Sequence, residues 1–165
     1  MNVIVVFESH WGNTASVARA IADGFGPDAR VLTTDEATPT VIADADLIIA
    51  GAPVMAFNLP SDRMLATLAG DAKAPTPPDL SHPSMRAWLE RLPAGHGRSA
   101  QFETGLRGSP GGATKAIGHK LEEAGFPRLG KSRRFVVKGS YGPLREGELE
   151  RAHEWGSELA AAMAA

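Results

Sequence analysis

The sequence predicts an α/β protein in which helices cover both faces of a doubly wound, five-stranded parallel sheet. The first observation is a pair of continuous apolar, β-branched runs at 3–7 and 46–50, typical of strands buried on both faces. The second is the alternation of strand patterns with helical periodicity, which indicates strands joined by helical crossovers. Because such crossovers are right-handed, few arrangements of the strands remain.

The strands and helices are expected to alternate along the chain. The expected strands are 3–7, 30–33, 46–50, 99–103 and 134–138. The expected helices are 15–25, a short helix between the second and third strands, 84–92, 113–124 and 146–163. Gly24 or Gly26 ends the first helix, because glycine readily adopts the backbone conformation of a helix C-cap. Trp88 and Trp155 lie on helical apolar stripes and are expected in the core.

Residues 71–83 interrupt this alternation. The stretch contains four prolines, which fit neither the interior of a helix nor a central strand. We therefore expect a surface excursion. It is too short and too close to its neighbours to separate two domains, so residues 1–165 are expected to form one domain around one core.

Composition narrows the possible functions. Hydrophobic residues make up 43% of the 165 residues and charged residues 22%, as in ordinary globular proteins. The net charge of -2 gives no broad field for attracting nucleic acid or an anionic membrane, and the 3–7 run is too short for membrane insertion. The chain has no cysteine, which excludes disulfides, thiolate nucleophiles and cofactor attachment through cysteine. That absence fits a cytoplasmic protein.

A hydroxyl- and glycine-bearing segment separates the first strand from the first helix. It consists of Ser9, His10, Trp11, Gly12, Asn13 and Thr14. Backbone N–H groups of a first helical turn lack partners and the helix dipole favours an anion, so this segment indicates a phosphate-binding loop. No Walker-type string for nucleotide phosphates occurs in the chain. The alternative is an ordinary turn in which Asn13 or Thr14 caps the helix.

Two further loops are expected beside this one. Ligands of an open parallel sheet bind beyond the carboxyl ends of its strands, where 52–60 and 104–112 would meet the phosphate loop. The histidines lack metal-ligand spacing with carboxylates, so no metal site is proposed, and no side chain is assigned a catalytic role. A local basic cluster is expected to be a hydrated face; it consists of Lys131, Arg133, Arg134 and Lys138.

The string VVFESHWGNT at 5–14 resembles the phosphate loop of the flavodoxin family, usually written Ser/Thr-x-Thr-Gly-x-Thr. The string DLIIAGAP at 46–53 resembles the third strand and following turn of that family, so the expected fold is flavodoxin-like. The resemblance implies noncovalent binding of FMN. It implies that the phosphate is held by Ser9, Trp11, Gly12, Asn13 and Thr14. We add His10 to these binding residues and expect its side chain to be exposed.

The resemblance also implies that the second and third loops flank the isoalloxazine ring. They contribute Pro53, Val54, Met55, Ala56 and Phe57, and Thr104, Gly105, Leu106 and Arg107. A flavin needs an apolar wall, which Val54, Met55 and Phe57 can supply. Arg107 is the candidate for contacting a flavin carbonyl edge or an anionic substrate, and a solvated side chain is the alternative.

Three features depart from carrier flavodoxins. Phe57 is the one aromatic residue of the second loop, no glycine lies between Ala52 and Ala69, and the net charge is nearly neutral rather than strongly acidic. The resemblance implies electron transfer with a redox partner protein or a small quinone-like acceptor. The alternatives are an NAD(P)H-dependent quinone-type reductase and an interaction domain that has lost FMN affinity. The oligomeric state is left open.

A phosphorylated receiver module shares the expected strand order but is disfavoured. Such a module needs an acidic pair after the first strand and an aspartate at the end of the third. The chain supplies one acidic residue, Glu8, at the first position and Gly51 at the second.

Overall fold

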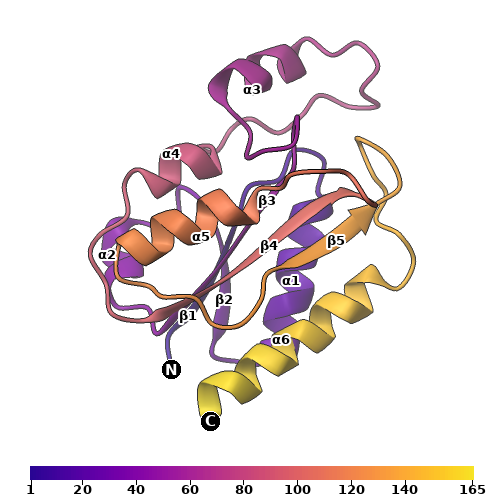
Figure 1. Ribbon diagram of the computed structural model, residues 1–165. Helices are drawn as coiled ribbons and strands as arrows, with labels where there is room; N and C mark the ends of the chain where they lie inside the picture. Colours follow the sequence, from indigo (N-terminus) through magenta and orange to yellow (C-terminus); the bar gives the residue numbers. More distant parts are fainter.

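The computed structural model describes residues 1–165 and contains one sheet of five parallel strands in the order β2-β1-β3-β4-β5. The strands are β1 (Val3–Phe7), β2 (Ala29–Thr33), β3 (Leu47–Pro53), β4 (Arg98–Leu106) and β5 (Arg133–Val137). The helices are α1 (Asn13–Phe25), α2 (Pro39–Ala43), α3 (Asp62–Ala69), α4 (Met85–Leu89), α5 (Thr114–Glu123) and α6 (Glu148–Ala164). The predicted five-stranded, doubly wound α/β fold is confirmed (Figure 1).

Helices cover both faces of the sheet, and the side chains of β1 are divided between the faces. Alternate residues of a strand point to opposite sides. Val3 and Val5 share one core with residues of α1 and α6, whereas Ile4 and Val6 share the other with residues of α2, α4 and α5. Figure 1 shows α1 beside α6 on one face and α4 beside α5 on the other. The continuous apolar run at 3–7 therefore reflects burial on both sides.

The strands β3 and β4 each end three residues later than the sequence predicts. They pair in parallel register from Leu47 opposite Arg98 to Pro53 opposite Thr104. Gly51 leaves room for the ring of Phe102, which would lie 2.3 Å from a β-carbon at this position. The backbone pairing between β3 and β4 continues beyond the apolar residues, so the apolar pattern of the sequence does not predict where the strands end. This pairing places parts of the second and third loops on rigid strand ends.

The direction of strand order reverses at β1, because β2 lies on one side of it and β3, β4 and β5 lie on the other. In open parallel sheets, ligands bind at this switch point, beyond the carboxyl ends of the strands. The segments that follow β1 and β3 are therefore neighbours at the edge where a ligand site is expected.

The helix α3 is not predicted by the sequence pattern, because eight residues give too little periodicity to separate a helix from a loop. Its first turn is capped by the Ser61 hydroxyl, which accepts a hydrogen bond from the Met64 amide at 3.3 Å. None of its residues is buried, and Figure 1 shows it apart from the helices that pack on the sheet. The segment 71–83 that follows contains no helix or strand, as its prolines predict.

Candidate functional site

A cavity of about 390 Å³ lies beyond the carboxyl ends of β1, β3, β4 and β5. This volume is in the range of small-molecule sites. Thirteen of the fifteen predicted binding residues line the cavity, and the two that do not are Gly12 and Arg107. The lining is completed by Leu68, Asp71, Ser109, Val137, Ser140 and Tyr141. The three predicted loops therefore meet, together with a fourth segment after β5.

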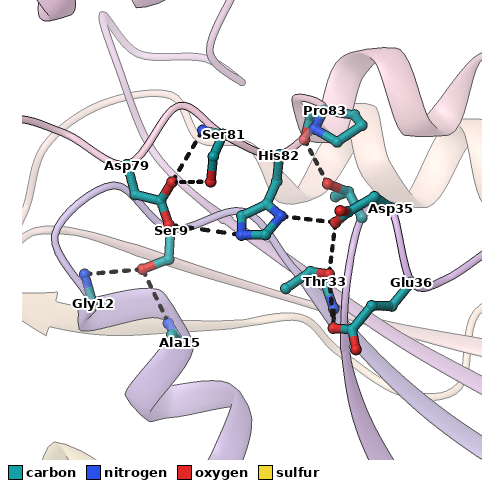
Figure 2. A network of polar contacts seen from close by, with 11 residues as sticks. Ser9, Gly12, Ala15, Thr33, Asp35, Glu36, Asp79, Ser81, His82 and Pro83 are labelled. Atoms are coloured by element: carbon teal, nitrogen blue, oxygen red, sulfur yellow. Dashed lines mark hydrogen bonds and ion pairs between the residues drawn. The ribbon is translucent and has the colours of Figure 1, made fainter.

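The first loop is organised around the hydroxyl of Ser9. Its Oγ accepts hydrogen bonds from the amides of Gly12 and Ala15, both at 3.2 Å, as Figure 2 shows. Gly12 has a φ of +93°, which L side chains rarely adopt, and α1 begins directly after it. The amides of Asn13 and Thr14, in the first turn of α1, have no acceptor within the helix. Both residues line the cavity, so the loop offers two backbone donors at this wall.

The capping alternative for this loop is wrong. The position before α1 is Gly12, which has no side chain to cap the helix, and the first-turn amide of Ala15 donates to Ser9 rather than to Asn13 or Thr14. Thr14 is buried, and its hydroxyl lies 2.8 Å from the hydroxyl of Thr104 at the end of β4. Two hydroxyls that share one hydrogen bond keep one proton for a further acceptor. The pair therefore ties the first loop to the third and leaves a donor at the cavity wall.

The expectation of an exposed His10 side chain is wrong. His10 is 6% exposed, and its Nε2 lies 2.8 Å from Oε2 of the buried Glu8. The other carboxylate oxygen of Glu8 accepts a hydrogen bond from the Met85 amide at 2.8 Å. A buried carboxylate needs such partners, because leaving it unpaired costs several kcal/mol, on the order of the desolvation of one ion. His10 is thus connected through Glu8 to the start of α4.

The second loop makes a tight turn with unusual backbone conformations. Met55 and Asn58 exchange two backbone hydrogen bonds of 2.9 Å, and Ala56 and Phe57 between them have φ values of +45° and +69°. Each left-handed residue with a side chain costs roughly 1–2 kcal/mol. The Gly112 amide donates to the Phe57 carbonyl at 3.0 Å and holds the turn against the third loop. The Phe57 ring is 62% exposed, so it forms the outer rim of the cavity.

The third loop supplies its lining residues from the end of β4, which includes Thr104, Gly105 and Leu106. Arg107 is exposed and lies outside the cavity lining, and Ser109 lines the cavity in its place. The structure therefore favours the solvated alternative for the Arg107 guanidinium.

Arg134 shapes this third loop from the neighbouring strand β5. Its guanidinium donates to the carbonyls of Leu106, Ser109 and Gly111 at 3.1, 2.8 and 2.8 Å. Its Nε also lies 2.6 Å from a carboxylate oxygen of Glu103, which is 5% exposed. The expected hydrated face does not hold for this member of the basic cluster, because its donors are used within the protein.

Tyr141, the single tyrosine of the chain, lines the cavity although it lies outside the three predicted loops. Its ring packs edge-to-face with Trp11, with ring centroids 4.8 Å apart and an interplanar angle of 76°. Asn13 Nδ2 donates to the Tyr141 carbonyl at 3.2 Å. The signal that points to Tyr141 is its place four residues after β5, since the carboxyl ends of all five strands share one edge of the sheet.

Two contacts fasten the segment after α3 to this aromatic pair. The Tyr141 hydroxyl donates to Asp71 Oδ2 at 2.5 Å, and Trp11 Nε1 donates to the Thr76 carbonyl at 2.9 Å. The hydrogen bond between Asp71 and Tyr141 raises the pKa of the phenol and lowers the pKa of the carboxyl. The aromatic wall of the cavity is therefore joined to the start of the 71–83 segment.

The far end of that segment is held beside the turn that follows β2, and Figure 2 shows the side chains involved. His82 Nδ1 lies 2.8 Å from Asp35 Oδ1, and its Nε2 lies 3.7 Å from Asp79 Oδ2. The Thr33 hydroxyl is the largest influence on the pKa of Asp35, which is lowered, with His82 also contributing. All these groups are exposed or half-exposed, so the contacts contribute little to the free energy of unfolding. Their effect is to position the end of the 71–83 segment.

Comparisons with known proteins agree with this architecture. A family model described as flavodoxin matches residues 5–155. A flavodoxin from the domain Archaea has 18% identity and a TM-score of 0.68, with 100% of both chains covered. A cysteine-to-serine mutant of the flavodoxin from Pseudomonas aeruginosa has 19% identity and a TM-score of 0.67, again with 100% of both chains covered.

Oxidised flavodoxin 1 from Bacillus cereus has 17% identity and a TM-score of 0.66, over 99% of this chain and 97% of that chain. No curated protein matches the chain. Neither α6 nor any shorter helix has the length and apolar character needed to cross a membrane. Because the family model spans 5–155, the chain belongs to the flavodoxin family, whose members bind FMN noncovalently and transfer electrons to redox partners.

Proposed function

We propose that this protein binds FMN in the cavity beyond the strand ends and passes electrons between a donor and a redox partner. The phosphate lies against the amides of Asn13 and Thr14 and the hydroxyl of Ser9. The ring lies between the second loop and the wall formed by Trp11 and Tyr141. We further propose the cytoplasm as the compartment, because a chain without cysteine needs no oxidising environment.

The donor set of the first loop is the observation that carries this proposal. The Ser9 oxygen already accepts two amides, so its own proton is the one it offers to a ligand. Amides of a first helical turn bind phosphate without cationic side chains, and such bonds to a charged acceptor are about twice as strong as neutral ones. No lysine or arginine lines the cavity. The residues present therefore fit a phosphate monoester at this end.

The remaining lining fits a flavin ring. Val54 and Met55 supply apolar surface, and the paired rings of Trp11 and Tyr141 supply a second wall. When bound, FMN supplies the one- and two-electron chemistry. The protein's own residues hold the cofactor, orient its ring and exclude water from it, which is how a protein tunes a reduction potential.

The absorption spectrum of the freshly purified protein tests the proposal. We expect a yellow protein whose flavin is released by acid, and whose FMN-free form quenches added FMN fluorescence at one equivalent. Riboflavin is the matched ligand, since it lacks only the phosphate. Because the phosphate contacts are charge-assisted, riboflavin should bind at least about a hundredfold more weakly.

A colourless protein that leaves FMN fluorescence unchanged at micromolar concentration would contradict the proposal. That result would support the alternative of an interaction domain without FMN affinity. Equal affinities for FMN and riboflavin would leave flavin binding in place but would contradict the assignment of the phosphate to the first loop.

A further inference from the structure

A second hollow opens beside the FMN cavity, between α3 and the second loop. It has a volume of about 610 Å³, which is ample for a small aromatic molecule. We call it the α3 groove. It shares Met55, Ala56, Leu68 and Asp71 with the FMN cavity, so a molecule in the groove lies next to whatever the cavity holds.

The α3 groove is apolar inside and carries an excess of positive charge. Met55, Met64 and Leu68 supply apolar surface, and methionine adapts well to ligands of varied shape. Arg63 and Lys73 also line it, and neither forms an ion pair within the protein. These two cations are complementary to an anionic group.

Asp71 is the one carboxylate that lines the α3 groove, and it is already engaged. One of its oxygens accepts the Tyr141 hydroxyl, and the other accepts the Lys73 amide at 2.9 Å. Its charge offsets one of the two cations, so the lining keeps a net charge of +1, from Arg63 and Lys73 against Asp71.

The apolar stripe of α3 is the second observation that points to a ligand. An amphipathic helix in a globular protein normally buries its apolar stripe against the core. Here Met64 and Leu68 are only half-buried, no residue of α3 is buried, and both side chains border the groove instead. The helix therefore forms a wall that a ligand can complete.

We propose that the α3 groove binds a small electron acceptor with a planar aromatic ring and an anionic substituent, and that this acceptor is reduced there by the neighbouring flavin. The ring lies on Met55 and Met64, and the anionic group faces Arg63 and Lys73. The inference rests on the proposed function, because the electrons come from reduced FMN.

The reaction is balanced for a quinone-type acceptor. Reduced flavin gives up two electrons and two protons and becomes oxidised flavin, while the quinone becomes a hydroquinone and leaves. A separate electron donor then reduces the flavin again. The α3 groove gives a small acceptor of this class a binding site of its own, separate from the cavity proposed for FMN.

Binding of a redox-inert probe tests the groove without any turnover. Naphthalene-2-sulfonate has the ring and the anionic group, and naphthalene-2-methanol is the matched neutral compound. Calorimetric titration should show one site for the sulfonate in both FMN-loaded and FMN-free protein, and weaker binding of the alcohol. In the double variant Arg63→Ser with Lys73→Ser, the dissociation constant should rise by about three- to tenfold, as expected for two exposed ion pairs.

The matched control is Lys131→Ser, an exposed cation on the connection between α5 and β5 that lines neither hollow. It should leave the dissociation constant of the sulfonate unchanged. Because Arg63 and Lys73 are exposed, the double variant should fold as the wild type does. A urea unfolding curve checks this.

A single-turnover reaction measures the transfer itself. Protein with photoreduced FMN is mixed with a sulfonated naphthoquinone, and oxidation of the flavin is followed by absorbance. The rate should saturate with quinone concentration, and the double variant should raise the half-saturating concentration by the same three- to tenfold, roughly the change seen with the inert probe, while leaving the maximal rate unchanged.

Three results would overturn the inference. They are no binding of the sulfonate, equal binding by the wild type and the double variant, and loss of the sulfonate site when FMN is loaded, which would place the probe in the FMN cavity. A chain that does not bind FMN at all would overturn the proposed function, and titration of the FMN-free protein would still test the groove.

Discussion

The two ends of the cavity proposed to bind FMN are built in different ways. At the phosphate end, Thr14, Thr104 and His10 are all buried. Thr14 and Thr104 share a hydrogen bond between α1 and β4, and His10 contacts Glu8, which accepts a hydrogen bond from the Met85 amide of α4. At the opposite end, α3 has no buried residue, and the following segment is held by exposed contacts such as that of His82 with Asp35.

This difference separates two tasks. Groups that are held in place before a ligand arrives lose little entropy on binding, so the phosphate end is suited to affinity. Segments with few buried contacts open locally at low free energy, so the α3 side is suited to exchange with small molecules or partners. The comparison predicts that substitutions have large effects at the phosphate end and small effects at the α3 side.

The largest effect is expected for Asn13→Asp, which places a carboxylate beside the phosphate. Repulsion between two such charges a few Å apart at a partly exposed site is worth roughly 3 kcal/mol, so FMN affinity should fall by at least about a hundredfold. Fluorescence titration measures it. Riboflavin is the control: the variant also loses the hydrogen bond from Asn13 Nδ2 to the Tyr141 carbonyl, so riboflavin affinity should fall too, but by only about tenfold or less. A similar loss for both ligands would mean that the variant disturbs the loop itself.

Glu8→Ala should destabilise the fold by about 2 kcal/mol, because the Met85 amide loses its buried acceptor and His10 loses its partner. Urea unfolding of the FMN-free protein measures the change. Asp62→Ala, in the exposed first turn of α3, is the matched substitution and should cost less than about 1 kcal/mol. Equal losses of unfolding free energy in the two variants would contradict the difference in stability between the phosphate end and the α3 side.

Glu148 provides a pH-dependent test away from the cavity, where α6 meets β5. Burial raises the pKa of its carboxyl, but hydrogen bonds from Arg151 and the Val136 amide and the contact with Arg145 outweigh this effect, so the pKa is lowered from 4.5. The stabilisation is therefore present above pH 4.5 and is lost as the pH falls through the lower value of the folded state.

Glu148→Gln should accordingly be less stable than the wild type at neutral pH, and the difference should shrink as the pH falls below 4.5. Thermal unfolding of both proteins at a series of pH values measures this. A difference that grows in acid would show that the carboxylate is not stabilised by these contacts.

Tyr141→Phe removes the hydrogen bond to Asp71 but keeps the ring against Trp11. Release of FMN, followed by stopped-flow fluorescence, should become faster by about two- to fivefold, since one partly buried hydrogen bond is lost. The affinity for riboflavin should fall by the same factor, because the phosphate is not involved. An unchanged release rate would show that the contact between Tyr141 and the 71–83 segment does not affect the exchange of FMN.

The smallest effect is expected for His82→Ala. Its exposed contacts with Asp35 and Asp79 contribute little, so the melting temperature should shift by less than about 2 °C. FMN affinity should stay unchanged. A clear loss of affinity would show that the distant end of this segment also supports the first loop.

Much of the fold could be predicted because local patterns report burial directly. The β-branched run at 3–7 predicts β1, the helical stripe after Ala15 predicts most of α1, and the prolines predict the irregular 71–83 segment. The rule that ligands lie beyond the strand ends then brings the first, second and third loops together. For this reason most of the predicted binding residues line one cavity.

The remaining features depend on partners that are distant in sequence. His10 is buried because its partner Glu8 is hydrogen-bonded to α4. Arg134 donates its hydrogen bonds to carbonyls of the third loop. Tyr141 is held at the cavity by its contacts with Trp11 and Asp71. None of these contacts follows a helical or strand period. The sequence by itself thus determined the parallel sheet and the position of the proposed phosphate loop, because hydrophobic periodicity and helix-terminal amides are local properties. Only the tertiary structure decided which side chains close the ring end and which hollow lies beside it, because these depend on how separate segments pack.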